Sequence, residues 1–114
     1  MNRSLDRGGT FRAGLIQMRS RRLPQANLDA ATAAAASAQY VQTPEMTNIM
    51  ELSRDKLFAA ITDEDNDICL KAFRKLAAEL KIYLHIGSLA IKASAEKAAN
   101  RSFVIDPRGA IVAR

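Results

Sequence analysis

The feature that most constrains the fold is an amphipathic segment that leads directly into a long apolar run. After Asp67, apolar side chains recur at helical spacing while the opposite face is charged. Residues 82–91 (IYLHIGSLAI) are then typical of a buried strand, with Gly87 and Ser88 either inside it or ending it. A helix that precedes such a strand predicts an α/β fold in which the helix covers a sheet. The apolar face comprises Ile68, Cys69, Ala72, Phe73, Leu76, Ala77 and Leu80.

The rest of the chain alternates short apolar runs with helical or turn segments. Pro24 suits a first helical turn, and seven alanines between Ala30 and Ala38 favour a helix over 25–38, although Leu28 is its only large apolar residue. Ser53 is a suitable N-cap for a short helix ending near Ile61. This order predicts a parallel or mixed sheet with helices on one or both faces. The expected strands are 11–18, buried on both faces, then 40–42, 99–105 and 110–113.

The positive charge is confined to one end of the chain. The net charge is +5, and residues 1–22 alone hold six arginines and one aspartate, so the remainder is neutral. A neutral body argues against a nucleic-acid-binding domain, which usually carries a basic stripe on a folded face. Residues 1–10 are polar and lack the apolar core of a secretory signal, so we expect a disordered leader there. A basic arm that touches RNA phosphates is the reading we disfavour.

Composition narrows the chemistry and the compartment. One cysteine, Cys69, excludes an internal disulfide framework, and one histidine, His85, excludes a multi-histidine metal site. No apolar run approaches the roughly 18 residues of a membrane span. We therefore expect a cytoplasmic protein with no metal, no cofactor, and neither a membrane nor a nucleic acid as partner.

Glu45 is the best candidate for chemistry. It follows a predicted strand and a proline, at the strand end where α/β sheets bind ligands, and a carboxylate there can serve as general base. Cys69 lies on the apolar helix face and is interpreted as a small buried residue rather than a nucleophile. His85 faces opposite to Leu84 and Ile86, which favours a structural histidine. The acidic cluster at 63–67 is interpreted as helix capping and solvated charge.

The sequence ends at Arg114, about four residues into the second strand of a predicted hairpin whose turn is 106–109. Such an end would leave a sheet edge open and apolar surface uncovered. We therefore expect 11–114 to be the N-terminal part of a longer domain.

Several segments in order resemble one family. The chain resembles the N-terminal part of the carbon–nitrogen hydrolase (nitrilase) superfamily over residues 11–114. From Asn27 to Glu45 it is shorter than the family's usual spacing, which removes residues that would pack the first helix. The matching segments are 13–18 (AGLIQM), Asn27-Leu28, 40–46 (YVQTPEM), 85–88 (HIGS) and 100–114 (NRSFVIDPRGAIVAR).

The resemblance implies an αββα sandwich and a Glu–Lys–Cys catalytic set. In the family a cysteine thiolate attacks the carbon of an amide or nitrile, and a thioester acyl-enzyme is then hydrolysed. Only the glutamate, Glu45, carries over, because the lysine and cysteine positions lie beyond Arg114. Met46, Thr47 and Asn48 are then candidate substrate-binding residues.

Two functions follow from this resemblance. The first is a fragment of a carbon–nitrogen hydrolase. The full-length form is expected to cleave a small amide, or less favourably a nitrile, and to be a homo-oligomer. The 114-residue chain alone is expected to be inactive. The second is a non-catalytic interaction module that keeps the half-sandwich and pairs with a partner chain through exposed edges at Tyr83 or Phe103.

Overall fold

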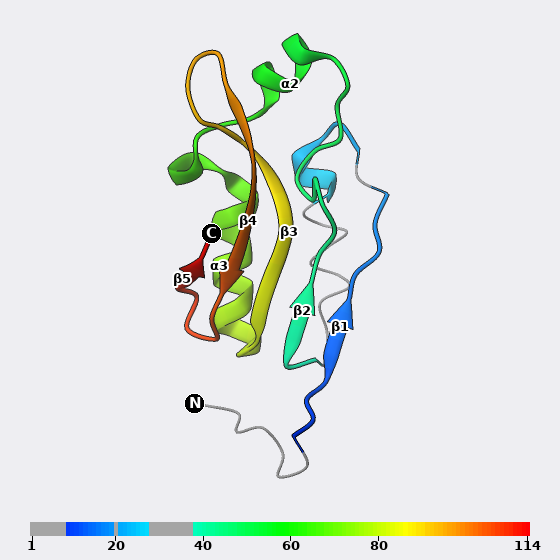
Figure 1. Cartoon of the computed structure of the whole chain (residues 1–114), viewed down its shortest axis with the longest axis vertical. Helices are drawn as coiled ribbons and strands as arrows, with labels where there is room; N and C mark the ends of the chain where they lie inside the picture. The colour runs from blue at the N-terminus through cyan, green and yellow to red at the C-terminus, as the bar shows by residue number, and fades with distance from the viewer. Residues whose placement is uncertain (1–8, 20, 28–37) are drawn as a thin grey trace.

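The computed structural model describes residues 9–19, 21–27 and 38–114. Five strands form one mixed sheet in the order β1-β2-β3-β4-β5 (Figure 1). β1, β2 and β3 are parallel, whereas β3, β4 and β5 are joined as antiparallel neighbours. The predicted α/β class with a mixed sheet is therefore confirmed. The strands are β1 (Ala13–Leu15), β2 (Tyr40–Gln42), β3 (Tyr83–Lys92), β4 (Ala98–Ile105) and β5 (Ile111–Ala113).

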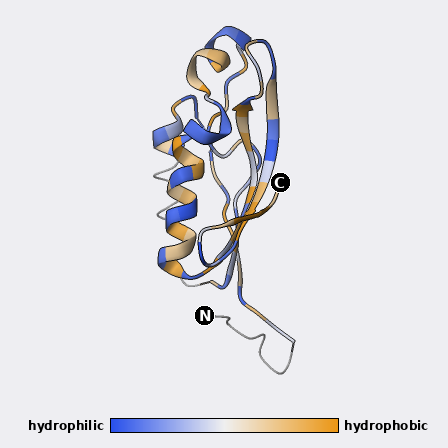
Figure 2. Cartoon of the chain, turned by 90° about the vertical axis from the view of Figure 1, so that its left-hand side faces the viewer, coloured by the Kyte–Doolittle hydropathy of each residue, from blue (hydrophilic) through white to orange (hydrophobic). Residues whose placement is uncertain are grey.

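One long helix covers one face of this sheet. Helix α3 (Ile68–Leu80) begins after Asp67, whose side chain accepts a hydrogen bond from the Leu70 N–H, and ends at Lys81 in the left-handed conformation. Figure 2 shows the helix lying along one face of the sheet, and its buried residues are Cys69, Leu70, Phe73 and Ala77. The main core therefore lies between α3 and the inner faces of β2, β3 and β4. Its largest fully buried members include Phe73, Leu84, Ile86, Leu89, Ile91, Phe103 and Ile105.

The predicted apolar face of α3 is partly wrong. Leu70 is buried, although it was not assigned to that face, whereas Ile68 is 49% exposed and Leu80 39% exposed. The sheet meets the helix along Cys69, Leu70, Phe73 and Ala77. Ile68 and Leu80 are the first and last residues of the helix, where fewer neighbouring side chains cover them.

In the segment before α3, helix-capping residues lie where the sequence predicts them. Helix α2 (Arg54–Ala60) has Ser53 as N-cap, and the turn η1 (Glu64–Asn66) is capped by Asp63. These capping roles confirm the interpretation of the acidic cluster in part. Glu64 has a different role, since it binds Arg101 of β4 and Arg114, the residue after β5.

The first strand is shorter and more exposed than predicted. β1 has three residues, and Leu15 is 77% exposed, so burial on both faces is wrong. β1 is an edge strand, and only Ile16 and Met18 just beyond it pack on the core. Residues 24–27 are helical as expected. The rest of the predicted helix, including Leu28, and most of the predicted leader lie outside the described residues.

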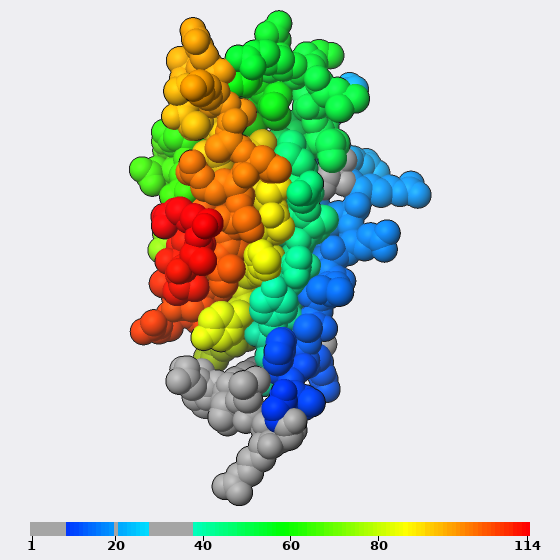
Figure 3. Space-filling view, in the orientation of Figure 1, coloured from blue at the N-terminus to red at the C-terminus, as the bar shows by residue number. Residues whose placement is uncertain are grey.

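The sheet face opposite α3 is formed by the strands themselves. In the register of the sheet, Leu15, Gln42, His85 and Val104 stand side by side on this face. Figure 3 shows the strands as adjacent bands of surface there. Tyr83 is 46% exposed, as the interaction hypothesis expects, but Phe103 is fully buried in the core and cannot serve as an exposed edge.

Candidate functional site

Glu45 lies in a tight turn directly after β2. Pro44 ends the strand, because a proline cannot donate to the sheet ladder, and Glu45 and Met46 form the turn. The Glu45 side chain is exposed, and within the described part of the chain its carboxylate makes no hydrogen bond or ion pair. The carboxylate is therefore exposed just beyond the carboxyl end of β2.

The turn itself is held firmly by β3. The N–H groups of Gly87 and Ser88 donate to the carbonyl oxygens of Thr43 and Pro44, at 3.1 and 3.3 Å. In the other direction, the N–H of Met46 donates to Ser88 Oγ at 2.8 Å, and the N–H of Thr47 donates to the Ser88 carbonyl at 2.9 Å. Four hydrogen bonds thus fasten the backbone on both sides of Glu45 to one short stretch of β3.

Gly87 is required by this contact. A Cβ at this position would lie 2.4 Å from the Thr43 carbonyl oxygen and 2.6 Å from that of Pro44. The turn also places Met46 at φ 51°, a conformation that few residues with a side chain adopt. Close approach and backbone strain therefore both mark this turn, as is common at functional sites.

The two polar residues that follow Met46 bond inside the protein. Thr47 Oγ1 donates within the turn, where Thr43 Oγ1 and the Pro44 carbonyl lie 2.8 and 2.6 Å away. The Asn48 amide pairs with the backbone of Ala90, and both Thr47 and Asn48 are fully buried. Met46 is half-buried and packs on a small apolar cluster of Ile49, Ile61 and Ala90.

A cluster of three hydrogen-bonded side chains, Tyr40, His85 and Ser102, lies on the open face of the sheet. Tyr40 Oη lies 2.6 Å from His85 Nδ1, and His85 Nε2 lies 3.2 Å from Ser102 Oγ. The Ser102 hydroxyl donates to the Ile86 carbonyl at 2.9 Å, so it accepts from His85 and does not act as an activated nucleophile. Burial raises the pKa of Tyr40, which keeps its hydroxyl protonated as a donor. The structural interpretation of His85 is confirmed.

Cys69 is a core residue. Its side chain is fully buried under the sheet, and its thiol lies 3.7 Å from the Pro24 carbonyl. A buried thiol in apolar surroundings is unreactive, which confirms the sequence interpretation. Among the described residues, no group of three or more His, Cys, Asp and Glu side chains comes together as a metal site.

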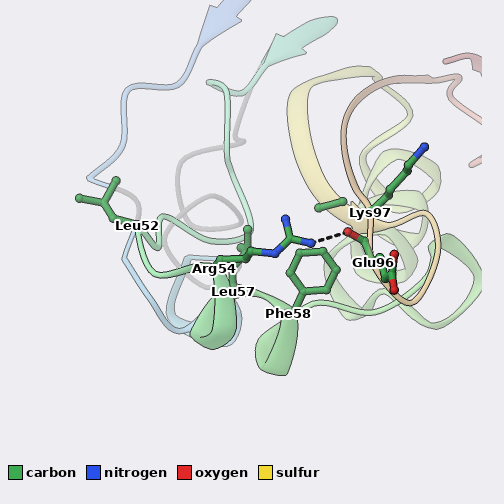
Figure 4. Close-up of a pocket in the computed structure, with 7 residues that line it drawn as sticks. Leu52, Arg54, Leu57, Phe58, Glu96 and Lys97 are labelled. Atoms are coloured by element: carbon green, nitrogen blue, oxygen red, sulfur yellow. Dashed lines mark hydrogen bonds between the residues drawn. The ribbon is translucent and has the colours of Figure 1, made fainter.

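One open groove in the described part of the chain does not include Glu45 in its lining. This groove of about 470 Å³ separates α2 from the tip of the β3–β4 hairpin (Figure 4). The Arg54 guanidinium crosses it, donates to the Glu96 carbonyl at 2.6 Å and lies over the Phe58 ring at 4.8 Å. Glu45 does not line this groove, so its depth gives no evidence about the carboxylate site.

Comparison with solved structures identifies the fold. An amidase from Nesterenkonia sp. matches 96% of this chain with a TM-score of 0.74 and 28% sequence identity. That amidase is described as a member of the nitrilase superfamily. The chain is related in structure to the nitrilase-superfamily amidases. It spans 43% of the length of the Nesterenkonia amidase. The five-stranded mixed sheet with its covering helix is thus part of a nitrilase fold.

More distant structures show the same nitrilase fold. The C. elegans NitFhit protein matches 90% of the chain with a TM-score of 0.71 and 22% identity. An N-terminal amidase in complex with a Gln-Gly peptide matches 90% with a TM-score of 0.67 and 16% identity. In each case the chain spans 26% of the matched structure. No protein-family model and no curated protein matches the sequence.

In the part of the chain that the structure describes, no helix has the length and apolar character to cross a membrane.

Proposed function

We propose that this chain supplies the general base, Glu45, of a nitrilase-type amidase that hydrolyses a small amide through a cysteine acyl-enzyme. The observation that carries the proposal is the turn after β2, where an exposed carboxylate stands on a backbone fixed from both sides by β3. The 28% identity to an amidase over 96% of the chain supports the same conclusion.

The proposed reaction assigns three proton transfers to Glu45. The carboxylate accepts the thiol proton of a cysteine, the thiolate attacks the amide carbon, and ammonia or an amine leaves with a proton from Glu45. Glu45 then accepts a proton from water as the thioester is hydrolysed to the acid. The family resemblance implies that the lysine that stabilises the tetrahedral intermediate and the cysteine nucleophile lie outside these 114 residues. Cys69 is buried in the core and does not fit the nucleophile. The 114-residue chain alone is therefore proposed to be inactive.

A small amide is favoured over a nitrile as substrate. In variants of the Nesterenkonia amidase with the glutamate replaced, acrylamide or the acetamide moiety of fluoroacetamide is attached to the active-site cysteine. In this chain Met46 is the residue beside Glu45 that we propose to line the substrate site. Thr47 and Asn48 were expected to bind substrate, and we now propose that they shape the turn, because their polar atoms bond within the protein.

A second candidate function is an interaction module. The open sheet face and its edges expose Leu15, Tyr83 and Val112, at 77%, 46% and 56%. Exposed apolar residues on strands favour pairing with another chain. This function requires no chemistry at Glu45.

The deciding experiment uses the native protein from its source. Its intact mass is measured first, and ammonia release from acetamide, propionamide and acrylamide is then assayed. A mass above twice 12.5 kDa and an activity abolished by Glu45→Gln support the amidase. The matched control is Glu79→Gln on the exposed side of α3, which should keep full activity. Activity retained in Glu45→Gln would overturn the proposed base, and an inactive native protein of 12.5 kDa would favour the interaction module.

A further inference from the structure

A β-bulge lies in β3 directly beneath Glu45. Ile86 pairs with Phe103 and Leu89 pairs with Arg101, so Gly87 and Ser88 stand opposite a single residue of β4. Such a bulge increases the local twist of a strand and redirects its side chains. The single residue opposite is Ser102. Its hydroxyl donates a hydrogen bond to the Ile86 carbonyl, next to the bulge.

The bulge turns Ser88 toward the Glu45 turn. Ser88 is only 3% exposed, and three of its polar groups serve that turn. Its N–H donates to the Pro44 carbonyl, its carbonyl accepts from the Thr47 N–H, and its hydroxyl accepts from the Met46 N–H at 2.8 Å. The last bond is the only one that a side chain of β3 makes to the peptide immediately after Glu45 among the described residues.

We infer that Ser88 is a positioning residue for Glu45, and that its hydroxyl helps to set the direction in which the Glu45 side chain leaves the backbone. This inference rests on the proposed amidase function. The Glu45–Met46 peptide is held with Met46 at φ 51°, which is costly for a residue with a side chain and persists only where neighbouring groups enforce it. The Ser88 hydroxyl bonds directly to the Met46 N–H and is the side-chain group of β3 that supports this conformation.

The direction of the Glu45 side chain depends on this peptide. Within the described part of the chain no group holds the carboxylate, so the backbone fixes only the direction of the Cα–Cβ bond from which the side chain projects. Without the hydroxyl, Met46 can return to negative φ, the peptide rotates, and the Cα–Cβ bond of Glu45 turns with it. General-base catalysis needs the carboxylate within hydrogen-bond reach of the proton that it accepts.

The first test measures the turn in the 114-residue chain. Amide hydrogen exchange by NMR is compared for wild type, Ser88→Ala and Ser94→Ala. Ser94 is the matched control, because its hydroxyl also accepts from backbone N–H groups, those of Glu96 and Lys97, in an exposed turn. In Ser88→Ala the Met46 amide should exchange about tenfold faster, while the Thr47 amide, bound to the Ser88 carbonyl, keeps its protection. Unchanged exchange at Met46 would overturn the inference.

The second test measures catalysis in the native enzyme. Ser88→Ala should lower kcat for a small amide about 10- to 100-fold, because a displaced base costs rate rather than binding. KM should stay within about twofold, and Ser88→Thr, which keeps the hydroxyl, should recover most of kcat. If Ser88→Ala does not fold, Ser88→Cys replaces it, since a thiol accepts hydrogen bonds only weakly.

The outcomes separate the two proposals. If Glu45→Gln abolishes activity while Ser88→Ala keeps the wild-type kcat, the amidase stands and the positioning role is overturned. If Glu45→Gln keeps activity, the proposed function fails and the catalytic role of Ser88 fails with it. Loss of kcat in Ser88→Ala with rescue by Ser88→Thr and faster exchange at Met46 supports both.

Discussion

The side-chain amide of Asn48 pairs with both backbone groups of Ala90. Asn48 Oδ1 accepts from the Ala90 N–H at 2.9 Å, and Asn48 Nδ2 donates to the Ala90 carbonyl at 3.0 Å. The amide thus takes the place of a neighbouring strand beside β3. Asn27 extends the arrangement by donating to the Asn48 carbonyl at 2.7 Å. The loop after Glu45 is therefore fastened to β3 beyond Ser88 as well as at Ser88.

Replacing Asn48 should destabilise the chain strongly. Asn48→Ala leaves the buried N–H and carbonyl of Ala90 without partners, and we expect a loss of about 2–4 kcal/mol in the free energy of unfolding. Asn100→Ala, an exposed asparagine in β4, should cost less than about 0.5 kcal/mol. Urea denaturation of both variants checks this. Equal stabilities would show that water replaces the amide at Ala90.

Adding a methyl group at Gly87 should also be costly. Gly87→Ala places a Cβ 2.4 Å from the Thr43 carbonyl oxygen, so the turn must move, and we expect a loss of more than about 2 kcal/mol. The control is Gly14→Ala in β1, where the nearest atom is 3.3 Å away and the cost should be below about 1 kcal/mol. Thermal and urea unfolding measure both. A Gly87→Ala variant as stable as Gly14→Ala would contradict the close approach.

Glu64 should make stability depend on acid pH. A hydrogen bond from Arg114 lowers the pKa of Glu64 below its ordinary 4.5, with partial burial opposing and Arg101 assisting. The folded chain then binds the proton less readily than the unfolded chain, so this stabilisation is present above about pH 4.5 and is lost as the pH falls through the lower folded-state pKa. Glu64→Gln should cost about 1 kcal/mol at pH 7 and progressively less in acid. Urea unfolding at several pH values measures the difference in unfolding free energy between wild type and Glu64→Gln. Glu79→Gln is the control. A difference that does not change with pH would disprove this role of Glu64.

Asp67 should behave in the opposite way. Burial raises the pKa of Asp67 above its ordinary 3.8, against hydrogen bonds from the Leu70 and Cys69 amides and from Asn48. Its charge is therefore unfavourable in the folded chain, and its contribution falls as the pH rises from about 3.8 through the raised pKa. Asp67→Asn keeps an acceptor for the helix and should be within about 1 kcal/mol of wild type at pH 7, whereas Asp67→Ala should lose about 1 kcal/mol or more. Chemical unfolding at pH 3 and 7 tests this, and an Asn variant less stable than the Ala variant would refute it.

The sequence predicted the elements that are determined by capping residues and by residues a few positions apart. The start of α3 at Asp67, the cap of α2 at Ser53 and the strand at 40–42 all follow from residues within a few positions of one another. The place of Glu45 was predictable for the same reason, because Pro44 ends a strand wherever that strand lies.

Features that depend on distant residues were missed. Leu70 is buried and Leu15 exposed because of where the sheet ends, which the periodicity of a single segment does not contain. The bulge at Gly87 and Ser88 depends on β4, and the two arginines that bind Glu64 come from β4 and the residue after β5. A glycine within an apolar strand was the one available sign that another backbone approaches it.

The order of the elements along the chain also suggests the order in which they fold. α3, β3, β4 and β5 are consecutive in the chain and meet through short connections, so they can associate early. The Met46–Ser88 bond joins residues 42 positions apart, and closing so long a loop costs entropy before any contact repays it. We therefore expect the segment with Glu45 to dock onto a scaffold that is already built. A sequence change that slows this docking would leave a compact, partly helical chain with its core formed and its carboxylate not yet in place.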